Sequence, residues 1–383
     1  MKNFELFLPT RYQFGAGVVQ KVGAEAGKLG RRALLVSGKS SASRSGLLAT
    51  VETLLKAEGL FVCSLGGVDP NPRLSTCVAG ARLCKEHAID VVVAVGGGSV
   101  LDASKTIAAL ALDGGEPWDF FTGARPITRA LPLVGVLTVA ATGSEYGPYA
   151  VITNEKTGEK LGTFGEAIIP RVSIVDPSLT FTVPARHTAF GAIDIISHHL
   201  EAYLACEEAP LIQDELTEVV IRSVIAHTGR ALADPEDLEA RSCLLWANTL
   251  ACGVFMAGRG AMRFDAHAVE HELSAAYDVP HGAGLAVILP ALMRWRAEKD
   301  PARVERFARQ VFGVSGNRPA RETALAGIQA FRDWCRSVGA PVTLAELGVP
   351  REAWSRHAEN VAGTPDGKDL GVAAVMEILS YAA

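Results

Sequence analysis

The chain has 383 residues, of which 49% are hydrophobic and 21% charged, and its formal net charge is −5. This length exceeds one ordinary hydrophobic core, so the sequence predicts a globular protein of two domains. The acidic balance, the lack of a basic patch and the lack of any bilayer-long apolar run argue against nucleic-acid or membrane binding.

The first half of the chain alternates short apolar runs with stretches of helical spacing. Strands are predicted at 32–38, 59–65, 89–98, 131–139, 149–154 and 171–177. Helices are predicted at 46–59 and 73–88, and a further helix opens at Ser99. Strand and helix in regular succession predict a parallel sheet with right-handed crossovers.

From Pro184 onward nearly every stretch has helical spacing. Helices are predicted at 185–204, 211–232, 237–258, 261–277, 281–297, 301–313 and 318–338, with two shorter ones after Pro341. The change of pattern predicts an α/β domain at 1–181 and an all-α domain at 182–383.

A glycine-rich turn joins a predicted strand to a helix in VVVAVGGGSVLDASK. Gly96, Gly97 and Gly98 can adopt backbone angles that other residues avoid, and they let a pyrophosphate come close. The helix that opens at Ser99 offers N–H groups and the positive end of its dipole to the anion. The turn is not GxGxxG, because Leu101 replaces the last glycine, and a plain tight turn is an open alternative.

A second turn, SGKSS, follows the first predicted strand. An acidic residue here would hold ribose hydroxyls and repel a 2′-phosphate. Gly38 instead leaves room, and Lys39, Ser40 and Ser41 could receive a phosphate. The pattern favours NADP(H) over NAD(H), and an ordinary surface loop is the alternative.

Two further segments supply candidate cofactor contacts. Asp102 and Lys105 extend the first turn to GGGSxxDxxK. In LTVAATGSE, the hydroxyls of Thr138, Thr142 and Ser144 follow a predicted strand. Many loops have such a composition, so this segment carries an argument only together with the glycine turn.

Candidate metal ligands cluster in the helical half. Asp194 and His198 are four residues apart and share one face of a predicted helix. His267 and His281 bracket HAVEHELSAAYDVPH. One carboxylate and three imidazoles can hold a divalent metal. Such a metal polarises a carbonyl, so beside a nucleotide site it indicates a hydride-transfer enzyme.

Two alternatives remain for these histidines. HAVEH fits the HxxEH pattern of inverted zinc peptidases, in which His267 and His271 bind zinc and Glu270 is the general base. The histidines could also serve packing alone. The peptidase interpretation leaves the upstream nucleotide turns without a role.

Four segments together resemble the iron-dependent (group III) alcohol dehydrogenase family. They are GGGSVLDASK (96–105), LTVAATGSE (137–145), GAIDIISHHLEAY (191–203) and HAVEHELSAAYDVPHG (267–282). The match covers about residues 5–300, with the four motifs in the family's order and spacing. DPNP (69–72) and ITNEKTGEKLG (152–162) look like the branch of butanol dehydrogenases and NADPH-dependent aldehyde reductases.

The resemblance implies a dehydroquinate synthase-like fold, in which an α/β dinucleotide-binding domain and a helical metal-binding domain enclose the site. It also implies interconversion of aldehydes and primary alcohols, usually by a homodimer. The implied ligands of Fe²⁺ or Zn²⁺ are Asp194, His198, His267 and His281. His271 matches a non-ligand histidine near the nicotinamide, and is predicted to relay a proton. Lys160 matches a lysine near the nicotinamide ribose.

Two departures from the family pattern bear on these expectations. Glu270 stands where family members usually carry a small residue, and Lys39 stands in a loop that is richer in glycine in NADPH-dependent relatives. Dehydroquinate synthase and glycerol-1-phosphate dehydrogenase resemble the same family and remain alternatives. A phosphorylated substrate needs several cations, but 185–206 and 261–285 contain only Arg186 and Arg263.

The seven cysteines are scattered without a CxxC pair. Reduced thiols are expected, and with no signal-peptide segment the sequence predicts a cytoplasmic location.

Overall fold

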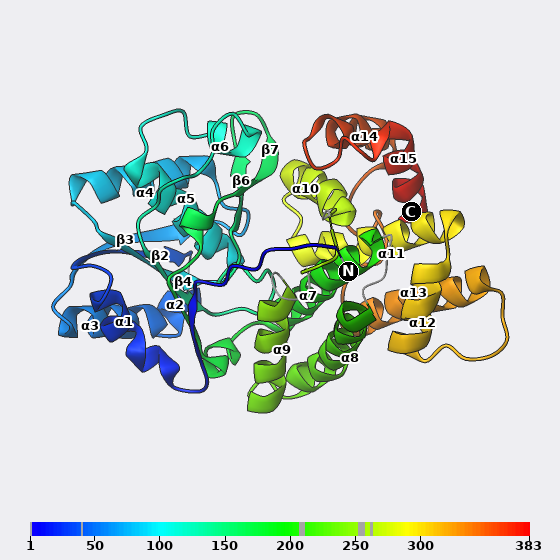
Figure 1. Cartoon of the computed structure of the whole chain (residues 1–383), viewed down its shortest axis with the longest axis horizontal. Helices are drawn as coiled ribbons and strands as arrows, with labels where there is room; N and C mark the ends of the chain where they lie inside the picture. Colours follow the sequence, from blue (N-terminus) through cyan, green and yellow to red (C-terminus); the bar gives the residue numbers. More distant parts are fainter. Residues whose placement is uncertain (1, 40, 207–210, 252–256, 261–262) are drawn as a thin grey trace. The chain divides into compact units, whose positions relative to one another are not determined.

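The computed structural model describes residues 2–39, 41–206, 211–251, 257–260 and 263–383 (Figure 1). By contacts the chain forms two compact units. The α/β unit comprises Phe7–Val183 and Pro235–Leu245, and the helical unit comprises Met1–Leu6, Pro184–Asp234 and Trp246–Ala383. The division into functional domains at 1–181 and 182–383 stays a prediction.

Six parallel strands form the sheet of the α/β unit, in the order β1-β8-β5-β4-β2-β3. The strands are β1 (Arg11–Phe14), β2 (Arg32–Gly38), β3 (Phe61–Val68), β4 (Val91–Gly96), β5 (Leu133–Leu137) and β8 (Val172–Val175). The predicted parallel sheet is confirmed, while β1 was not predicted because RYQF has no apolar run.

Helices cover both faces of this sheet, as Figure 1 shows on either side of the strands. Residues of α1 (Val22–Gly27) and α3 (Leu47–Ala57) pack in one core cluster, and residues of α4 (Leu74–Glu86) and α5 (Gly98–Leu112) pack in the other. Val91, Val93 and Val95 of β4 face the first cluster, and Val92 and Ala94 face the second. Burial on both faces explains why a parallel strand reads as one continuous apolar run.

The predicted strand at 149–154 does not join this sheet. β6 (Tyr149–Asn154) pairs antiparallel with β7 (Glu159–Phe164) in a separate two-stranded sheet. The chain reverses over residues 155–158, where Gly158 has a φ of 73°. A connection this short closes a hairpin and cannot make the crossover that a parallel neighbour requires.

The order of the strands fixes where a ligand can lie in the α/β unit. From β2 the chain passes through α3 to β3, whereas from β4 it passes through α5 to β5 on the other side. β2 and β4 are neighbours, with Ser37 opposite Val95. The carboxyl ends of these two strands therefore form a topological switch point, the usual ligand position in open parallel sheets.

Short elements complete the α/β unit. They are η1 (Val18–Lys21), α2 (Ser41–Arg44), α6 (Asp119–Thr122), η2 (Glu166–Ile168) and η3 (Pro177–Thr180).

The second half of the chain is helical, as predicted. Its helices are α7 (Ala185–Ala205), α8 (Leu211–Ala233), α9 (Leu238–Ala251), α10 (Asp265–Tyr277), α11 (His281–Lys299), α12 (Ala302–Phe312), α13 (Ala320–Ser337), η5 (Arg351–Ala353), α14 (Trp354–Gly363) and α15 (Gly371–Tyr381). The buried helix α11 packs against α7, α10, α13 and α15. Within the described ranges, no helix combines the length and apolar character needed to cross a lipid bilayer.

Candidate functional site

The glycine turn lies at the switch point of the α/β unit. Gly97 caps α5, which starts at Gly98, one residue earlier than predicted. None of Gly96, Gly97 and Gly98 has a positive φ, so the turn does not use the left-handed backbone angles that glycine permits. A Cβ on Gly96 would lie 2.4 Å from Cγ2 of Val100, and one on Gly98 would lie 2.4 Å from Oγ1 of Thr142. Space, rather than backbone conformation, therefore requires these two glycines.

The DPNP segment is fastened to the start of α5 and to β7. Ser99 donates a hydrogen bond from its hydroxyl to the carbonyl of Pro70. Lys160 Nζ donates to Oδ1 of Asn71 over 3.1 Å, and both side chains are buried. The Ser99 hydroxyl thus already has a partner within the chain, while cofactor binding by this turn stays a prediction.

Asp102 and Ser144 meet in a buried network. Ser144 Oγ donates to Asp102 Oδ1 over 2.6 Å, and the Val151 amide donates to Oδ2 over 2.9 Å. The fully buried Lys105 donates to Ser144 Oγ and to the carbonyls of Gly147 and Tyr149. Burial raises the pKa of Asp102, although the charge of Lys105 opposes this shift. The network ties the segment after β5 to α5, while direct cofactor contacts by Asp102 and Ser144 stay predictions.

The second turn lies at the end of β2, where Gly38 pairs with Val68 of β3. Lys39 forms an ion pair with Asp69, the residue that follows β3. The sequence analysis did not predict a carboxylate beside this turn. Ser40 lies outside the described residues, as does the side chain of Ser41.

The third cofactor segment follows β5, the other neighbour of β4. The backbone N–H of Thr138 donates to the carbonyl of Gly96 over 3.0 Å. Thr142 Oγ1 accepts from the amide of Ser144 over 3.2 Å. All three predicted cofactor segments therefore follow neighbouring strands at the same edge of the sheet.

The structure brings the four candidate metal ligands of the helical unit together. Asp194 and His198 lie on α7, His267 lies on α10, and His281 is the first residue of α11. Asp194 Oδ1 lies 3.2 Å from His198 Nδ1, 3.7 Å from His267 Nε2 and 3.6 Å from His281 Nε2. Asp194, His267 and His281 offer ligand atoms that all lie within 4.8 Å of one another, and His198 lies outside this tighter group.

Each imidazole has an oxygen acceptor at Nδ1. His198 Nδ1 contacts the Asp194 carbonyl over 2.9 Å, while His267 Nδ1 pairs with Glu201 and His281 Nδ1 with Glu270. An Nδ1–H that donates to oxygen leaves the lone pair on Nε2, which is the atom that then binds a metal. These acceptors therefore favour the tautomer that a three-histidine metal site requires.

Two atoms of the group have unmet bonding capacity. Asp194 Oδ1 and His267 Nε2 are buried and make no hydrogen bond within the described part of the chain. Burial opposes ionisation of Asp194, but the neighbouring imidazoles of His198 and His281 outweigh it and lower its pKa well below the ordinary value. An ionised, buried oxygen beside imidazole nitrogens fits a bound cation, because unpaired buried polar atoms are costly.

Close helix packing fixes His281 in this group. A Cβ on Gly282 would lie 2.2 Å from the Phe190 carbonyl oxygen of α7, so glycine lets α11 start directly against that helix. Between α10 and α11 the chain turns at Asp278, which has a φ of 52°. The PHG motif thus places an imidazole where α7, α10 and α11 meet.

Two carboxylates contact these imidazoles. Glu270 was expected from the sequence to make the surroundings of the metal more acidic, while Glu201 was given no role. Glu201 is buried and lies seven residues after Asp194, two helical turns along the same face, and this spacing could have indicated it. Glu270 is fully buried and its oxygens accept from His281 and Ser274. A carboxylate held in this way is poorly placed as the general base of the HxxEH peptidase alternative.

Two further histidines lie near the group. His271 is half-buried, with its ring centroid 5.5 Å from that of His281 and 5.9 Å from that of His267. His199 is buried instead, with Nε2 3.3 Å from the carbonyl of Ala247, and burial lowers its pKa to about 3. His199 is therefore a neutral packing residue.

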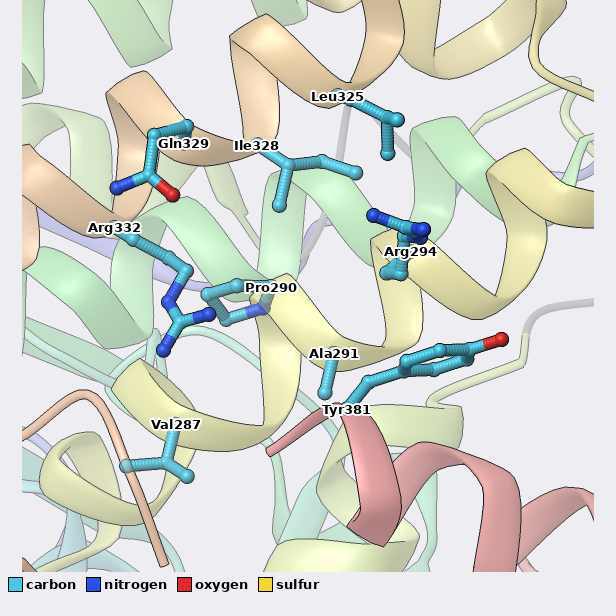
Figure 2. A pocket seen from close by; sticks show the side chains of 9 residues that line it. All are labelled: Val287, Pro290, Ala291, Arg294, Leu325, Ile328, Gln329, Arg332 and Tyr381. Atoms are coloured by element: carbon cyan, nitrogen blue, oxygen red, sulfur yellow. The ribbon is translucent and has the colours of Figure 1, made fainter. Parts of the chain in front are cut away.

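A cavity of about 130 Å³ in the helical unit is separate from these residues (Figure 2). It is lined by Val287, Pro290, Ala291, Arg294, Leu325, Ile328, Gln329, Arg332 and Tyr381. Arg294 pairs with Glu298, and Arg332 donates to the carbonyl of Val342. None of the candidate site residues lines this cavity, so we assign it no role in the reaction.

Family models match both halves of the chain. Residues 9–177 match "Iron-containing alcohol dehydrogenase", and residues 188–379 match "Fe-containing alcohol dehydrogenase family, C-terminal". The chain belongs to the iron-containing alcohol dehydrogenase family. The predicted resemblance is confirmed, and the metal candidates lie in the part matched by the C-terminal family model.

The relatives of this iron-containing alcohol dehydrogenase include butanol dehydrogenases and an aldehyde reductase. It is 40% identical to the probable NADH-dependent butanol dehydrogenase 1 of Bacillus subtilis, covering 92% of this chain and 91% of that protein. It is 33% identical to the NADPH-dependent aldehyde reductase of Escherichia coli, and the match covers 91% of this chain and 90% of that protein. The crystal structure of an NADH-dependent butanol dehydrogenase A from Thermotoga maritima, 42% identical in sequence, superposes with a TM-score of 0.96. The superposition covers 100% of this chain and 99% of that one. These relatives confirm the predicted branch.

Proposed function

We propose that this protein interconverts aldehydes and primary alcohols by hydride transfer with NAD(P)H at an iron site. The observation that carries the proposal is the buried Asp194 Oδ1, which faces the imidazoles of His198, His267 and His281 and makes no hydrogen bond in the described chain. The names of the butanol dehydrogenase and aldehyde reductase relatives support it.

In the reductive direction, aldehyde, NAD(P)H and a proton give a primary alcohol and NAD(P)⁺. Bound iron supplies a Lewis acid for the carbonyl oxygen, and reduced nicotinamide supplies the hydride. Asp194, His198, His267 and His281 would hold the ion, and Zn²⁺ suits the same donors. The N-terminus of α5, with Gly97, Gly98 and Ser99, would hold the cofactor pyrophosphate.

The proton of the new hydroxyl group needs a donor. His271 lies beside His267 and His281 and is half-buried. An imidazole has an ordinary pKa near neutral, which suits proton transfer at physiological pH. We propose that His271 relays this proton, with Lys160 orienting the nicotinamide ribose.

For the cofactor, we propose that the turn after β2 accepts NADP(H) in preference to NAD(H). Gly38 leaves space at the strand end, and Lys39 offers a charge to a 2′-phosphate. The ion pair between Lys39 and Asp69 opposes this preference, since a phosphate must displace the carboxylate from the lysine. Named relatives include both NADH-dependent and NADPH-dependent enzymes.

Replacing Gly38 by aspartate is expected to lower kcat/KM for NADPH by at least about tenfold, or about 1.4 kcal/mol, and to change kcat/KM for NADH much less. The new carboxylate would repel a 2′-phosphate, and folding should persist. A Cβ at Gly38 meets Val100 at an ordinary 3.7 Å, and the φ of Gly38 is not positive. Steady-state kinetics with both cofactors measure the ratio.

The matched control is Ser43→Asp, which adds the same charge at an exposed position in α2. It should leave the cofactor ratio near that of the unmodified protein. Equal losses in both variants, or no loss in Gly38→Asp, would show that this turn does not contact the 2′-phosphate.

The sugar-phosphate alternative finds little support in the helical unit. Arg263, one of two arginines near the metal motifs, is paired with Asp265 and lies 3.5 Å from Asp369. Its charge is thus already compensated, so we propose a substrate without a phosphate group.

One assay tests the proposed function. The protein is stripped of metal, reloaded anaerobically with Fe²⁺ or Zn²⁺, and NADH or NADPH absorbance is followed with a panel of aliphatic aldehydes. Turnover that requires the metal is expected. If no metal restores turnover with either cofactor, the proposed function is wrong. Light scattering of the same sample tests the homodimer that the family resemblance implies.

A further inference from the structure

We infer that Glu270 is a positioning residue that strengthens divalent-cation binding by holding the His281 imidazole and by adding negative charge behind that ring. This inference rests on the proposed metal site. It concerns how tightly a cation is held, beyond which side chains ligate it.

Glu270 is held rigidly by its neighbours. It is 0% exposed, and one oxygen accepts from Nδ1 of His281 while the other accepts from the hydroxyl of Ser274. A Cβ on Gly284 would lie 2.6 Å from Cγ of Glu270, so glycine at this position makes the room that the carboxylate occupies. The side chain therefore fits only while residue 284 has no side chain of its own.

The contact with Glu270 sets both the tautomer and the orientation of the His281 ring. With Nδ1–H donating to Glu270, the ring presents its Nε2 lone pair, and this atom lies 3.6 Å from Asp194 Oδ1. A carboxylate on the far nitrogen also makes an imidazole more basic and a stronger metal ligand. Glu201 makes the same contact with His267, so two of the three imidazoles are supported by carboxylates.

The negative charge of Glu270 also favours a cation bound in this group. Asp194, Glu201 and Glu270 place three buried carboxylates around the imidazoles of this group. Burying one more anion is costly by itself, but a dication in the group turns that cost into attraction. Glu270 should thus raise cation affinity through charge as well as through orientation.

The chain offers a matched control on the same helix. Glu272 of α10 accepts from Nδ1 of His357 over 2.9 Å and from Asn360 over 2.7 Å. This carboxylate–imidazole pair includes no candidate metal ligand. A substitution there removes the same kind of contact from α10 without changing the proposed site.

The test measures Co²⁺ and Zn²⁺ dissociation constants by chelator competition for the full-length protein, Glu270→Gln and Glu272→Gln. We expect Glu270→Gln to weaken binding by about 10–100-fold and to shift the visible absorption of bound Co²⁺. Glu272→Gln should match the unmodified protein. Ser274→Ala keeps the Glu270 charge but removes one anchor, so a smaller weakening is expected.

The outcomes separate this inference from the proposed function. Tight binding by the unmodified protein together with unchanged affinity in both Glu270→Gln and Ser274→Ala would overturn the role of Glu270 alone. Failure of the unmodified protein to bind any dication would instead contradict the proposed metal site. If Glu270→Gln does not fold, unchanged affinity in Ser274→Ala decides against the inference.

Discussion

Asp194→Ala is expected to lose bound iron and aldehyde reduction together, with kcat/KM falling by at least about a thousandfold, or about 4 kcal/mol of barrier. Asp194 is the only carboxylate among the proposed ligands, and its Oδ1 lies within 3.7 Å of nitrogen atoms of His198, His267 and His281. Without it, neutral imidazoles alone would face the cation. Metal content per chain and steady-state kinetics measure the two losses.

The control for this substitution is His187→Ala, a partly buried histidine near the start of the same helix. It should retain both iron and turnover. Circular dichroism of Asp194→Ala checks that α7 still folds. Normal iron content and normal turnover in a folded Asp194→Ala protein would contradict the assignment of the ligand.

His271→Ala is expected to lower kcat by about 10²–10⁴-fold, the usual contribution of a general acid or base. Iron content should stay unchanged, since His271 is proposed to relay a proton and not to bind the metal. The pH profile of kcat should lose the limb that reports the imidazole. Added imidazole in solution should restore part of the rate.

Two results would change the role of His271. Full turnover with an unaltered pH profile would exclude it from proton transfer. Loss of iron would make it a ligand instead, an arrangement compatible with the second group of nearby donors, Glu270, His271 and His281.

The elements predicted best are those whose sequence signal is local. The run IDVVVAVG predicted β4 because both faces of a central parallel strand are buried, and helical spacing predicted α7 and α11 closely. β6 was placed in the wrong sheet because an apolar run does not specify its partner. Only the short turn at 155–158 reveals the hairpin.

In the candidate site, too, spacing along one helix was predictable from the sequence, whereas contacts between different elements were not. Spacing placed Asp194 and His198 on one face of α7, and the structure agrees. The contact of Glu270 with His281 depends on how α10 turns into α11, which no periodicity encodes. The pairing of Lys39 with Asp69 likewise depends on β2 lying beside β3.

The glycine turn lies between β4 and α5, as predicted. The sequence argument rested on the backbone freedom of glycine and on room for a pyrophosphate, whereas in the structure Val100 and Thr142 leave no space for a Cβ at Gly96 and Gly98. A sequence pattern shows that glycine is present at such positions, but it does not show whether the backbone angles or the lack of space for a side chain require it.

Anomalous diffraction at the iron absorption edge tests the metal assignment most directly. For crystals grown with Fe²⁺ under anaerobic conditions, we predict one strong peak per chain, within coordination distance of the Asp194 carboxylate and of Nε2 of His198, His267 and His281. A protein that binds iron but shows its peak away from these four side chains would contradict the account.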